Sequence, residues 1–209
     1  MTTRPDPRPL TRAAWWLARP TIHSVGRLLW RLRVEGEAFP EPPFVIAANH
    51  HSFLDPAVVG ASYGKRQRFI TLVDLFGNYR LLDWTLQIFE VIRIRRDSVP
   101  LAAMREALDH LGSGGVVTVF PEGTRVGQLG EIAPRPGAAW LAARAEVPLV
   151  PVLVQGTDRV LGVDNKLHRG QIRVVVGRSL HPRGKGRTDV GDLSRRWADE
   201  IGSMAQRSR

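Results

Sequence analysis

The chain has 209 residues, 43% of them hydrophobic, which is enough for one well-packed domain and too short for two of ordinary size. It contains no cysteine, so disulfides, thiolate metal sites and a cysteine nucleophile are excluded. The net charge is +10, and of the thirty basic residues twenty-seven are Arg. A protein this basic is attracted to polyanions, either nucleic acid or anionic lipid headgroups.

The first 33 residues differ from the rest in composition. Residues 1–9 are rich in Pro and charge and are predicted to be disordered. From Leu10 to Arg33 the pattern is helical, with Trp and Leu alternating with Arg and a break at Pro20. Such a helix either lies in a lipid headgroup layer or packs on the domain with its Arg residues in water. We expect a disordered tip and an amphipathic helical segment at 1–33, followed by the main domain at 34–209.

No stretch of the sequence approaches the ~20 apolar residues that a membrane-spanning helix needs. The apolar run Ala13–Ala18 is shorter than the core of a secretory signal, and Arg19-Pro20 ends it. We therefore expect an unprocessed chain in the cytoplasm.

Short apolar runs then alternate with helical patterns. The predicted strands are Phe44–Ala48, Phe69–Val73, Val91–Ile94, Val116–Phe120, Leu149–Val154 and Ile172–Val176. The predicted helices are Pro56–Tyr63, Tyr79–Phe89, Val99–Leu111, Gly137–Ala145 and Asp192–Ala205. Near-continuous Val and Ile strands are buried on both faces, so helices must cover each side. The pattern predicts an α/β fold: a single three-layer domain with a mostly parallel central sheet flanked by helices, after the amphipathic N-terminal helical segment.

The segment Asn49-His50-His51-Ser52-Phe53-Leu54-Asp55 joins a predicted strand to a predicted helix. His50 alone among the six His residues has an Asp five positions further on. A turn here can bring the Asp55 carboxylate onto one imidazole nitrogen and leave the other free to take a proton. Asp55 also suits a helix N-cap, a purely structural role, and it can fill both. His51 lacks a carboxylate at this spacing and is predicted to be an ordinary loop histidine.

Other catalytic chemistries fit the sequence less well. Ser52 lies near His50, but no Gly-x-Ser-x-Gly segment is present, and Gly112-Ser113-Gly114 lacks that spacing. No His-x3-His or Cys-based set suggests a metal site. Of these catalytic chemistries, direct transfer of a group to an activated hydroxyl is the one that remains.

The segment Phe120-Pro121-Glu122-Gly123-Thr124-Arg125 follows a predicted buried strand, so it should lie at the carboxyl edge of the sheet, where α/β domains bind ligands. Gly123 allows a tight turn, and backbone N–H groups at Gly123 and Thr124 can face an anion. The Arg125 guanidinium suits phosphate oxygens, and Glu122 can accept a hydrogen bond from a substrate hydroxyl or pair with an Arg. The alternative is a solvated charged turn.

Three arginines, Arg93, Arg95 and Arg96, end the predicted strand Val91–Ile94. Strand alternation puts Arg93 and Arg95 on one face and Arg96 on the other. Arginines at a strand end are commonly just solvated.

Taken together and in this order, these segments resemble the glycerolipid acyltransferases over roughly residues 34–157. The family's four motifs are matched by Asn49-His50-x4-Asp55, by Glu90-Val91-Ile92-Arg93-Ile94-Arg95-Arg96, by Phe120–Arg125 and by Val147-Pro148-Leu149-Val150-Pro151-Val152. The second motif departs from the family pattern, with Glu90 in place of Gly and Arg95 in place of Asp. The resemblance implies that His50 is the general base and that Asp55 orients it. The substrate-binding residues it implies are Arg96, Glu122, Gly123, Thr124 and Arg125.

The resemblance also implies an O-acyltransferase of phospholipid biosynthesis, moving a fatty acyl chain from acyl-CoA or acyl carrier protein to the free hydroxyl of a lysophospholipid. We expect 1-acyl-glycerol 3-phosphate as the acceptor. A lyso-ornithine lipid or glycolipid acceptor is an alternative, as is a non-catalytic basic module that binds membrane or nucleic acid. The expected partners are the lysophospholipid, the acyl thioester donor and an anionic membrane surface, with no nucleic acid, no metal and no other cofactor. The family context favours the membrane role for the N-terminal segment and a peripheral position on the cytoplasmic face of the cell membrane.

Overall fold

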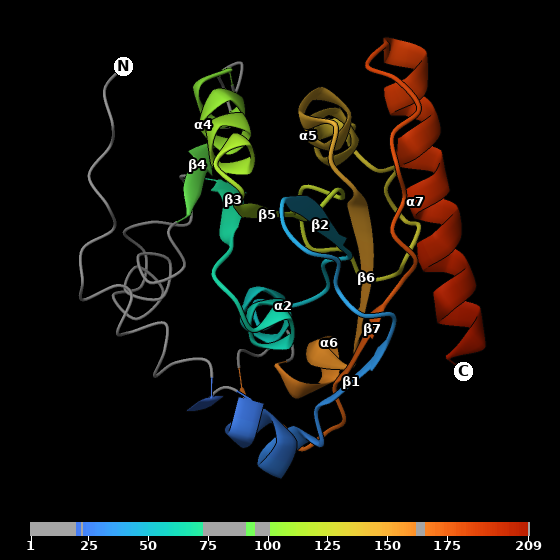
Figure 1. Ribbon diagram of the computed structural model, residues 1–209. Coiled ribbons are helices and arrows are strands. Elements are labelled where there is room, and N and C mark those ends of the chain that lie inside the picture. The colour runs from blue at the N-terminus through green and yellow to red at the C-terminus, as the bar shows by residue number, and fades with distance from the viewer. Residues whose placement is uncertain (1–19, 22, 73–90, 95–100, 162–165, 209) are drawn as a thin grey trace.

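The computed structural model describes residues 20–21, 23–72, 91–94, 101–161 and 166–208. Several predictions fall outside these residues: the disordered tip, the first half of the N-terminal helical segment, the helix Tyr79–Phe89, and both Arg95 and Arg96. The described part is a seven-stranded sheet with helices on both of its faces (Figure 1). The predicted α/β class is confirmed.

The sheet places β2 in its centre. The strands are β1 (Arg33–Gly36), β2 (Phe44–Ala48), β3 (Arg68–Leu72), β4 (Ile92–Ile94), β5 (Val116–Val119), β6 (Leu149–Gln155) and β7 (Arg173–Val176). Their order is β1-β7-β6-β2-β5-β3-β4, and every neighbouring pair is parallel except β6 and β7. Because β2 runs parallel to β5 on one side and to β6 on the other, the loops that follow these three strands emerge together at one edge.

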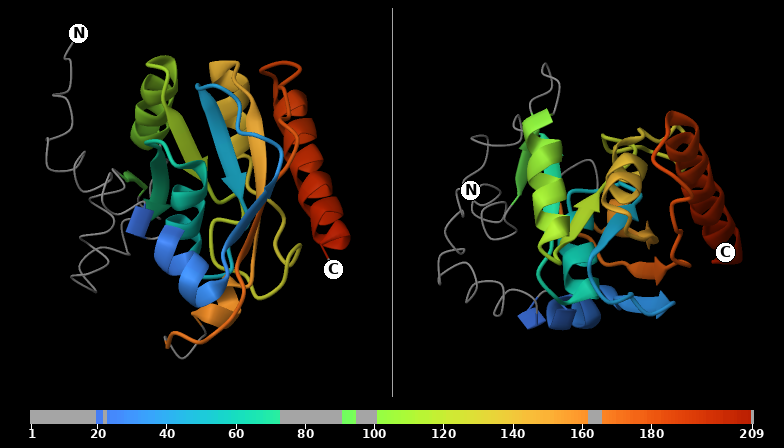
Figure 2. Two further views of the ribbon diagram at one scale, coloured as in Figure 1. Left: turned by 60° about the horizontal axis from the view of Figure 1, so that its bottom comes forward. Right: turned by 45° about the horizontal axis from the view of Figure 1, so that its top comes forward.

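Two hydrophobic cores fill the space on either side of the sheet. The helices are α2 (Asp55–Tyr63), α4 (Leu101–Gly112), α5 (Gly137–Ala145), α6 (Thr157–Val160) and α7 (Arg187–Arg207). Val45 and Ala47 face a core shared with α4, α5 and α7, while Phe44 and Ile46 face the core shared with α2 and α6. Figures 1 and 2 show α4, α5 and α7 side by side on one face of the sheet, with α2 and α6 on the other. These are the three predicted layers.

Two short elements and one helix boundary differ from the prediction. β1 contains a single apolar residue and lies at the edge of the sheet, so it carries no hydrophobic pattern. α6 is only four residues long. α7 begins at Arg187, five residues before the predicted start, because the Asp189 carboxylate accepts the Gly186 N–H at 3.1 Å and so caps the helix there. The other described elements begin and end within two residues of their predicted bounds.

Residues 23–30 are helical and lead directly into β1. The end of this helix is tied to the domain, since the Ile172 N–H donates to the Trp30 carbonyl oxygen at 2.9 Å and Leu32 is only 3% exposed. Leu28 and Leu29, in contrast, are 83% and 54% exposed. Among the described residues, no helix combines the length and the apolar character needed to cross a bilayer.

Candidate active site

The two motif segments meet at the carboxyl edge of the sheet. Because Ala47 of β2 lies opposite Val119 of β5, the loops that follow the two strands start side by side. The His50 N–H donates to Oε2 of Glu122 at 2.5 Å, and the Val126 N–H donates to the His50 carbonyl oxygen at 2.9 Å. Segments some seventy residues apart in the sequence therefore form one rigid unit.

The Asp55 carboxylate is fully buried and accepts hydrogen bonds from four groups. Its Oδ2 lies 2.8 Å from Nδ1 of His50 and 2.7 Å from the N–H groups of both His51 and Ser52. Its Oδ1 accepts the Thr157 hydroxyl at 2.5 Å. Asp55 is the first residue of α2, Leu54 holds the N-cap position, and no side chain caps this helix end. The carboxylate points back at the His50 turn, so the helix-cap interpretation of Asp55 is wrong.

The contact with Asp55 determines the imidazole tautomer of His50. An oxygen that already accepts two backbone N–H groups acts as an acceptor toward Nδ1, so we assign the ring proton to Nδ1 and leave Nε2 free to accept one. The imidazole stacks on the Phe120 ring, with 4.3 Å between centroids and 25° between planes. His50 is therefore held at both a ring edge and a ring face.

The neighbours of His50 have structural contacts. Nδ1 of His51 lies 2.8 Å from the Val126 carbonyl oxygen, away from Asp55, as expected for a loop histidine. The Asn49 side chain pairs with the backbone of Val154 in both directions, donating at 2.9 Å and accepting at 2.7 Å. Asn49 thus extends the pairing of β2 with β6 by one residue beyond the strand end, rather than serving donors within its own turn.

Glu122 lies behind the His50 turn. It is 2% exposed, and its Oε2 accepts the His50 N–H. Burial raises the pKa of Glu122 to about 7; the hydrogen bond from His50 and the charge of His51 offset only part of this. The contact of Glu122 with a substrate hydroxyl stays a prediction: the structure shows its carboxylate accepting the His50 N–H, and Glu122 is not among the residues that line the cavity described next.

A cavity of about 520 Å³ opens beside His50, with a mainly apolar wall. The apolar wall comes from Ile70, Ile94, Met104, Val119, Phe120, Pro136 and Ala138. Gly123, Thr124 and Arg125 also line it, so three of the predicted substrate-binding residues are next to His50. Gly123 has φ +70°, and a Cβ there would lie 2.7 Å from Nε of Arg135, so only glycine fits this turn without strain.

Two arginines stand at this cavity. The Arg125 guanidinium lies 3.7 Å from the centroid of the Phe53 ring, a cation–π contact that holds the charge in place. Arg135 is exposed, and its backbone N–H donates to the Pro121 carbonyl oxygen at 2.7 Å, which ties Arg135 to the same turn. Of the three arginines near Val91–Ile94, Arg93 is described and exposed, and it does not line the cavity.

Sequence reasoning missed Thr157, Arg135 and Phe53. None of the three has a spacing that marks it, because each reaches the site through the packing of separate strands and loops. The parallel pairing of β2 with β6 is the one signal that could have found Thr157, since it brings polar residues after β6 to the same sheet edge.

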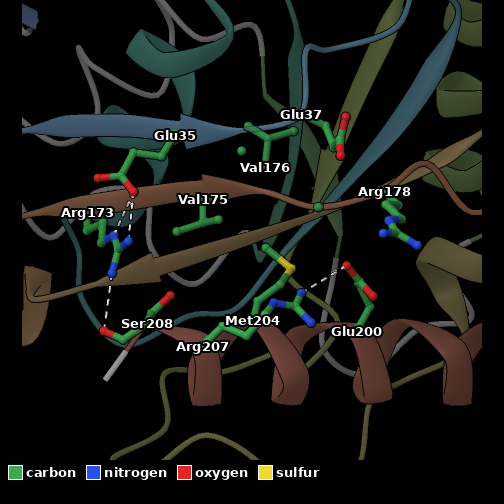
Figure 3. Close-up of a pocket in the computed structure, with 12 residues that line it drawn as sticks. Glu35, Glu37, Arg173, Val175, Val176, Arg178, Glu200, Met204, Arg207 and Ser208 are labelled. Atoms are coloured by element: carbon green, nitrogen blue, oxygen red, sulfur yellow. Dashed lines mark hydrogen bonds and ion pairs between the residues drawn. The ribbon is translucent and has the colours of Figure 1, made fainter.

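A second hollow, of about 460 Å³, lies at the other end of the sheet between β1, β7 and α7 (Figure 3). Its charges are largely paired internally: Arg173 binds Glu35 at 2.7 Å and the Ser208 carbonyl oxygen at 3.2 Å, and Arg207 lies 3.6 Å from Glu200. Arg173 thus joins two strands to the end of α7, which is a structural role. The described residues include no group of three His, Cys, Asp or Glu side chains that could hold a metal ion.

Fold and site together define an α/β domain in which a buried Asp holds a His beside an apolar cavity with Arg at its rim. The sequence model of the family described as Acyltransferase matches residues 31–155, which is more than half of the chain. The chain belongs to the acyltransferase family.

Several curated proteins are similar to this chain. The chloroplastic 1-acyl-sn-glycerol-3-phosphate acyltransferase LPAT1 of Arabidopsis thaliana is 30% identical over 161 residues, covering 73% of this chain and 44% of the relative. A 1-acyl-sn-glycerol-3-phosphate acyltransferase of Pseudomonas aeruginosa is 31% identical over 202 residues, covering 90% of this chain and 73% of the relative. The chain thus spans less than half the length of the plant relative and most of the bacterial one.

The fold has a counterpart among solved structures. The crystal structure of the 1-acyl-sn-glycerophosphate (LPA) acyltransferase PlsC from Thermotoga maritima superposes with a TM-score of 0.72 at 20% identity, covering 95% of this chain and 84% of that one. At this identity the likeness concerns the fold alone.

Proposed function

We propose that the protein transfers a fatty acyl group from an acyl thioester, acyl-CoA or acyl carrier protein, to the free hydroxyl of 1-acyl-glycerol 3-phosphate in phospholipid biosynthesis. The observation that carries the proposal is the 2.8 Å contact of His50 with Asp55 beside an apolar cavity that Arg125 also lines. These are the parts that such a reaction requires: a base for the hydroxyl, an apolar space for a fatty chain and a cation for the phosphate. The names of the similar proteins support the same acceptor.

The reaction needs one proton-transfer group. The acceptor hydroxyl gives its proton to Nε2 of His50 while its oxygen attacks the thioester carbonyl carbon. The carbon–sulfur bond then breaks, the ester forms, and the departing thiolate takes the proton from His50. Asp55 keeps the imidazole in the required tautomer and stabilises its positive charge, as a buried carboxylate does in serine hydrolases. Thioester cleavage supplies the driving force, so the proposed step needs no metal or other cofactor.

Arg125 binds the acceptor phosphate in this proposal, with Arg135 beside it. A guanidinium that rests on an aromatic face, as Arg125 does on Phe53, keeps its in-plane N–H groups for phosphate oxygens. The backbone N–H of Thr124 completes the anion site, whereas that of Gly123 donates to the Phe120 carbonyl oxygen at 3.0 Å. Arg96 stays a predicted further ligand.

We also infer a peripheral position on the cytoplasmic face of the cell membrane. The helix at residues 23–30 carries the exposed Leu28 and Leu29 next to Arg27 and Arg31, a combination typical of helices that lie in a headgroup layer. Bringing the enzyme to the bilayer brings it to an insoluble acceptor.

The direct test is thiol release from acyl-CoA, and separately from acyl carrier protein, with lysophosphatidic acid present. One thiol should appear per phosphatidic acid formed, and Asp55→Asn should lower turnover while the protein stays folded, because it disturbs the orientation and charge balance of His50. The same assay with lyso-ornithine lipid and lysoglycolipid acceptors separates the alternatives within the chemistry. A folded protein that releases no thiol with any acceptor would leave a non-catalytic basic module as the better description.

A further inference from the structure

The loop after β6 supplies a side chain to the His50–Asp55 pair. Gly156, which follows β6, has φ +83°, and a Cβ there would lie 2.0 Å from the Gln171 carbonyl oxygen, so the chain can turn tightly here only with glycine. This turn places Thr157 at the start of α6, fully buried, with its hydroxyl 2.5 Å from Oδ1 of Asp55. The two residues are 102 positions apart in the sequence.

The two oxygens of Asp55 are served from different directions. Oδ2 accepts hydrogen bonds from three donors in the His50–Ser52 turn, whereas Oδ1 accepts the Thr157 hydroxyl. A carboxylate held at one oxygen can still rotate about its Cβ–Cγ bond, and rotation would change the angle at which Oδ2 meets His50. A second donor on the opposite oxygen fixes the plane of the group.

We propose that Thr157 is the third member of the His50–Asp55 pair, a positioning residue that fixes the Asp55 carboxylate plane and through it the imidazole of His50. The inference rests on the proposed function, in which His50 is the base. Thr157 does not line the cavity next to His50, so it acts through Asp55 and leaves the binding of both substrates untouched.

Thr157→Val removes the hydroxyl and keeps the shape, while Thr157→Ser keeps the hydroxyl. A hydrogen bond to a charged group is lost in the first variant, so kcat should fall about 10- to 100-fold, with both KM values unchanged. Thr157→Ser should retain most of the wild-type kcat. This split between kcat and KM distinguishes positioning from a role in substrate binding.

Thr118 offers a matched control. It is also a fully buried threonine, and its hydroxyl donates to Gln67, whose own amide donates to the Gly60 carbonyl oxygen of α2 and not to Asp55. Thr118→Val should lower the melting temperature in the way that Thr157→Val does, yet leave kcat unchanged. Equal losses of kcat in the two valine variants would make the effect one of general stability and overturn the proposal. If Thr157→Val does not fold, Thr157→Ala and Thr157→Ser replace it, and equal kcat values in these two would refute the role.

A measurement without turnover separates this inference from the proposed function. The proton on Nδ1 of His50, identified by its loss in His50→Ala, should give a downfield NMR signal that shifts or broadens in Thr157→Val and stays in place in Thr118→Val. An unchanged signal in Thr157→Val refutes the inference whatever the activity. A wild-type protein that turns over no acyl thioester refutes the proposed function, and the NMR comparison still decides whether Thr157 controls the pair.

Discussion

Glu122 makes the pH dependence of stability a sharp test of the site geometry. Replacing it by Gln removes the ionisable group and keeps a carbonyl oxygen that can accept the His50 N–H. The substitution therefore isolates the cost of holding a carboxyl group in this buried position, without breaking the contact that joins the two motif loops.

The magnitude follows from the pKa of Glu122, which burial raises from 4.5 to about 7 in the folded protein. Below pH 4.5 the carboxyl is protonated in both the folded and the unfolded state, and burial costs nothing extra. Between pH 4.5 and about 7 the Glu122 carboxyl is ionised in the unfolded chain and still protonated in the folded protein, so the free energy of unfolding falls as pH rises. At about 1.4 kcal/mol per tenfold change, the full loss is about 3 kcal/mol above that window.

Urea unfolding of the wild type and of Glu122→Gln across this pH range measures the effect. The difference in unfolding free energy between variant and wild type should move in favour of Glu122→Gln as pH rises, by about 3 kcal/mol from the acid to the alkaline end. The pH dependence of groups that do not interact with Glu122 cancels in this difference. Parallel curves for the two proteins would mean that Glu122 is solvated, and the buried contact with His50 would be refuted with it.

Three further outcomes are expected. His50→Ala should lower turnover by about 10²–10⁴-fold without unfolding the protein, with His51→Ala as the control that loses far less; near-normal turnover without His50 would exclude it as the base. Arg125→Ala should raise the KM for the lysophospholipid about 10- to 100-fold and barely change that for the thioester, and Arg125→Lys should recover only part of the loss; unchanged preference for phosphorylated acceptors would put the headgroup elsewhere. Leu28→Glu should weaken sedimentation with anionic vesicles, whereas Leu101→Glu, at a comparably exposed leucine on α4, should not; equal binding by both variants would contradict docking through residues 23–30.

The sequence was sufficient to predict the layers and most of the described elements, because buried strands and amphipathic helices leave local patterns. Strand order was beyond it. Continuous Val and Ile runs indicate that β2, β5 and β6 are buried, but they do not tell which strand lies beside which. The edge strand β1 left no such pattern, since its side chains are mostly exposed.

The contacts of the site likewise fall into those that local sequence predicts and those that depend on strand order. His50 and Asp55 are five positions apart in a predicted strand-to-helix turn, so their contact could be inferred from local sequence. The contact of Glu122 with His50 was missed because a charged residue in a turn suggests contact with solvent or substrate. Nothing in the local sequence indicates that Glu122 is buried or that it accepts the backbone N–H of His50, which lies in the loop after β2. Thr157 could be found only once β6 was known to lie next to β2.

The position of β2 between β5 and β6 explains why the His50 turn can be rigid although it is a loop. From the β5 side, Glu122 accepts the His50 N–H. From the β6 side, Asn49 pairs with the backbone of Val154 and Thr157 donates to Asp55. A general base must be held near one geometry to be effective, and a loop anchored from two neighbouring strands meets that demand better than one closed on itself. The about 3 kcal/mol that burying Glu122 costs is therefore spent where it fixes the imidazole. Glu122→Ala removes this acceptor and leaves the His50 N–H unpaired, so it should loosen the base and lower turnover more than Glu122→Gln, which keeps the contact.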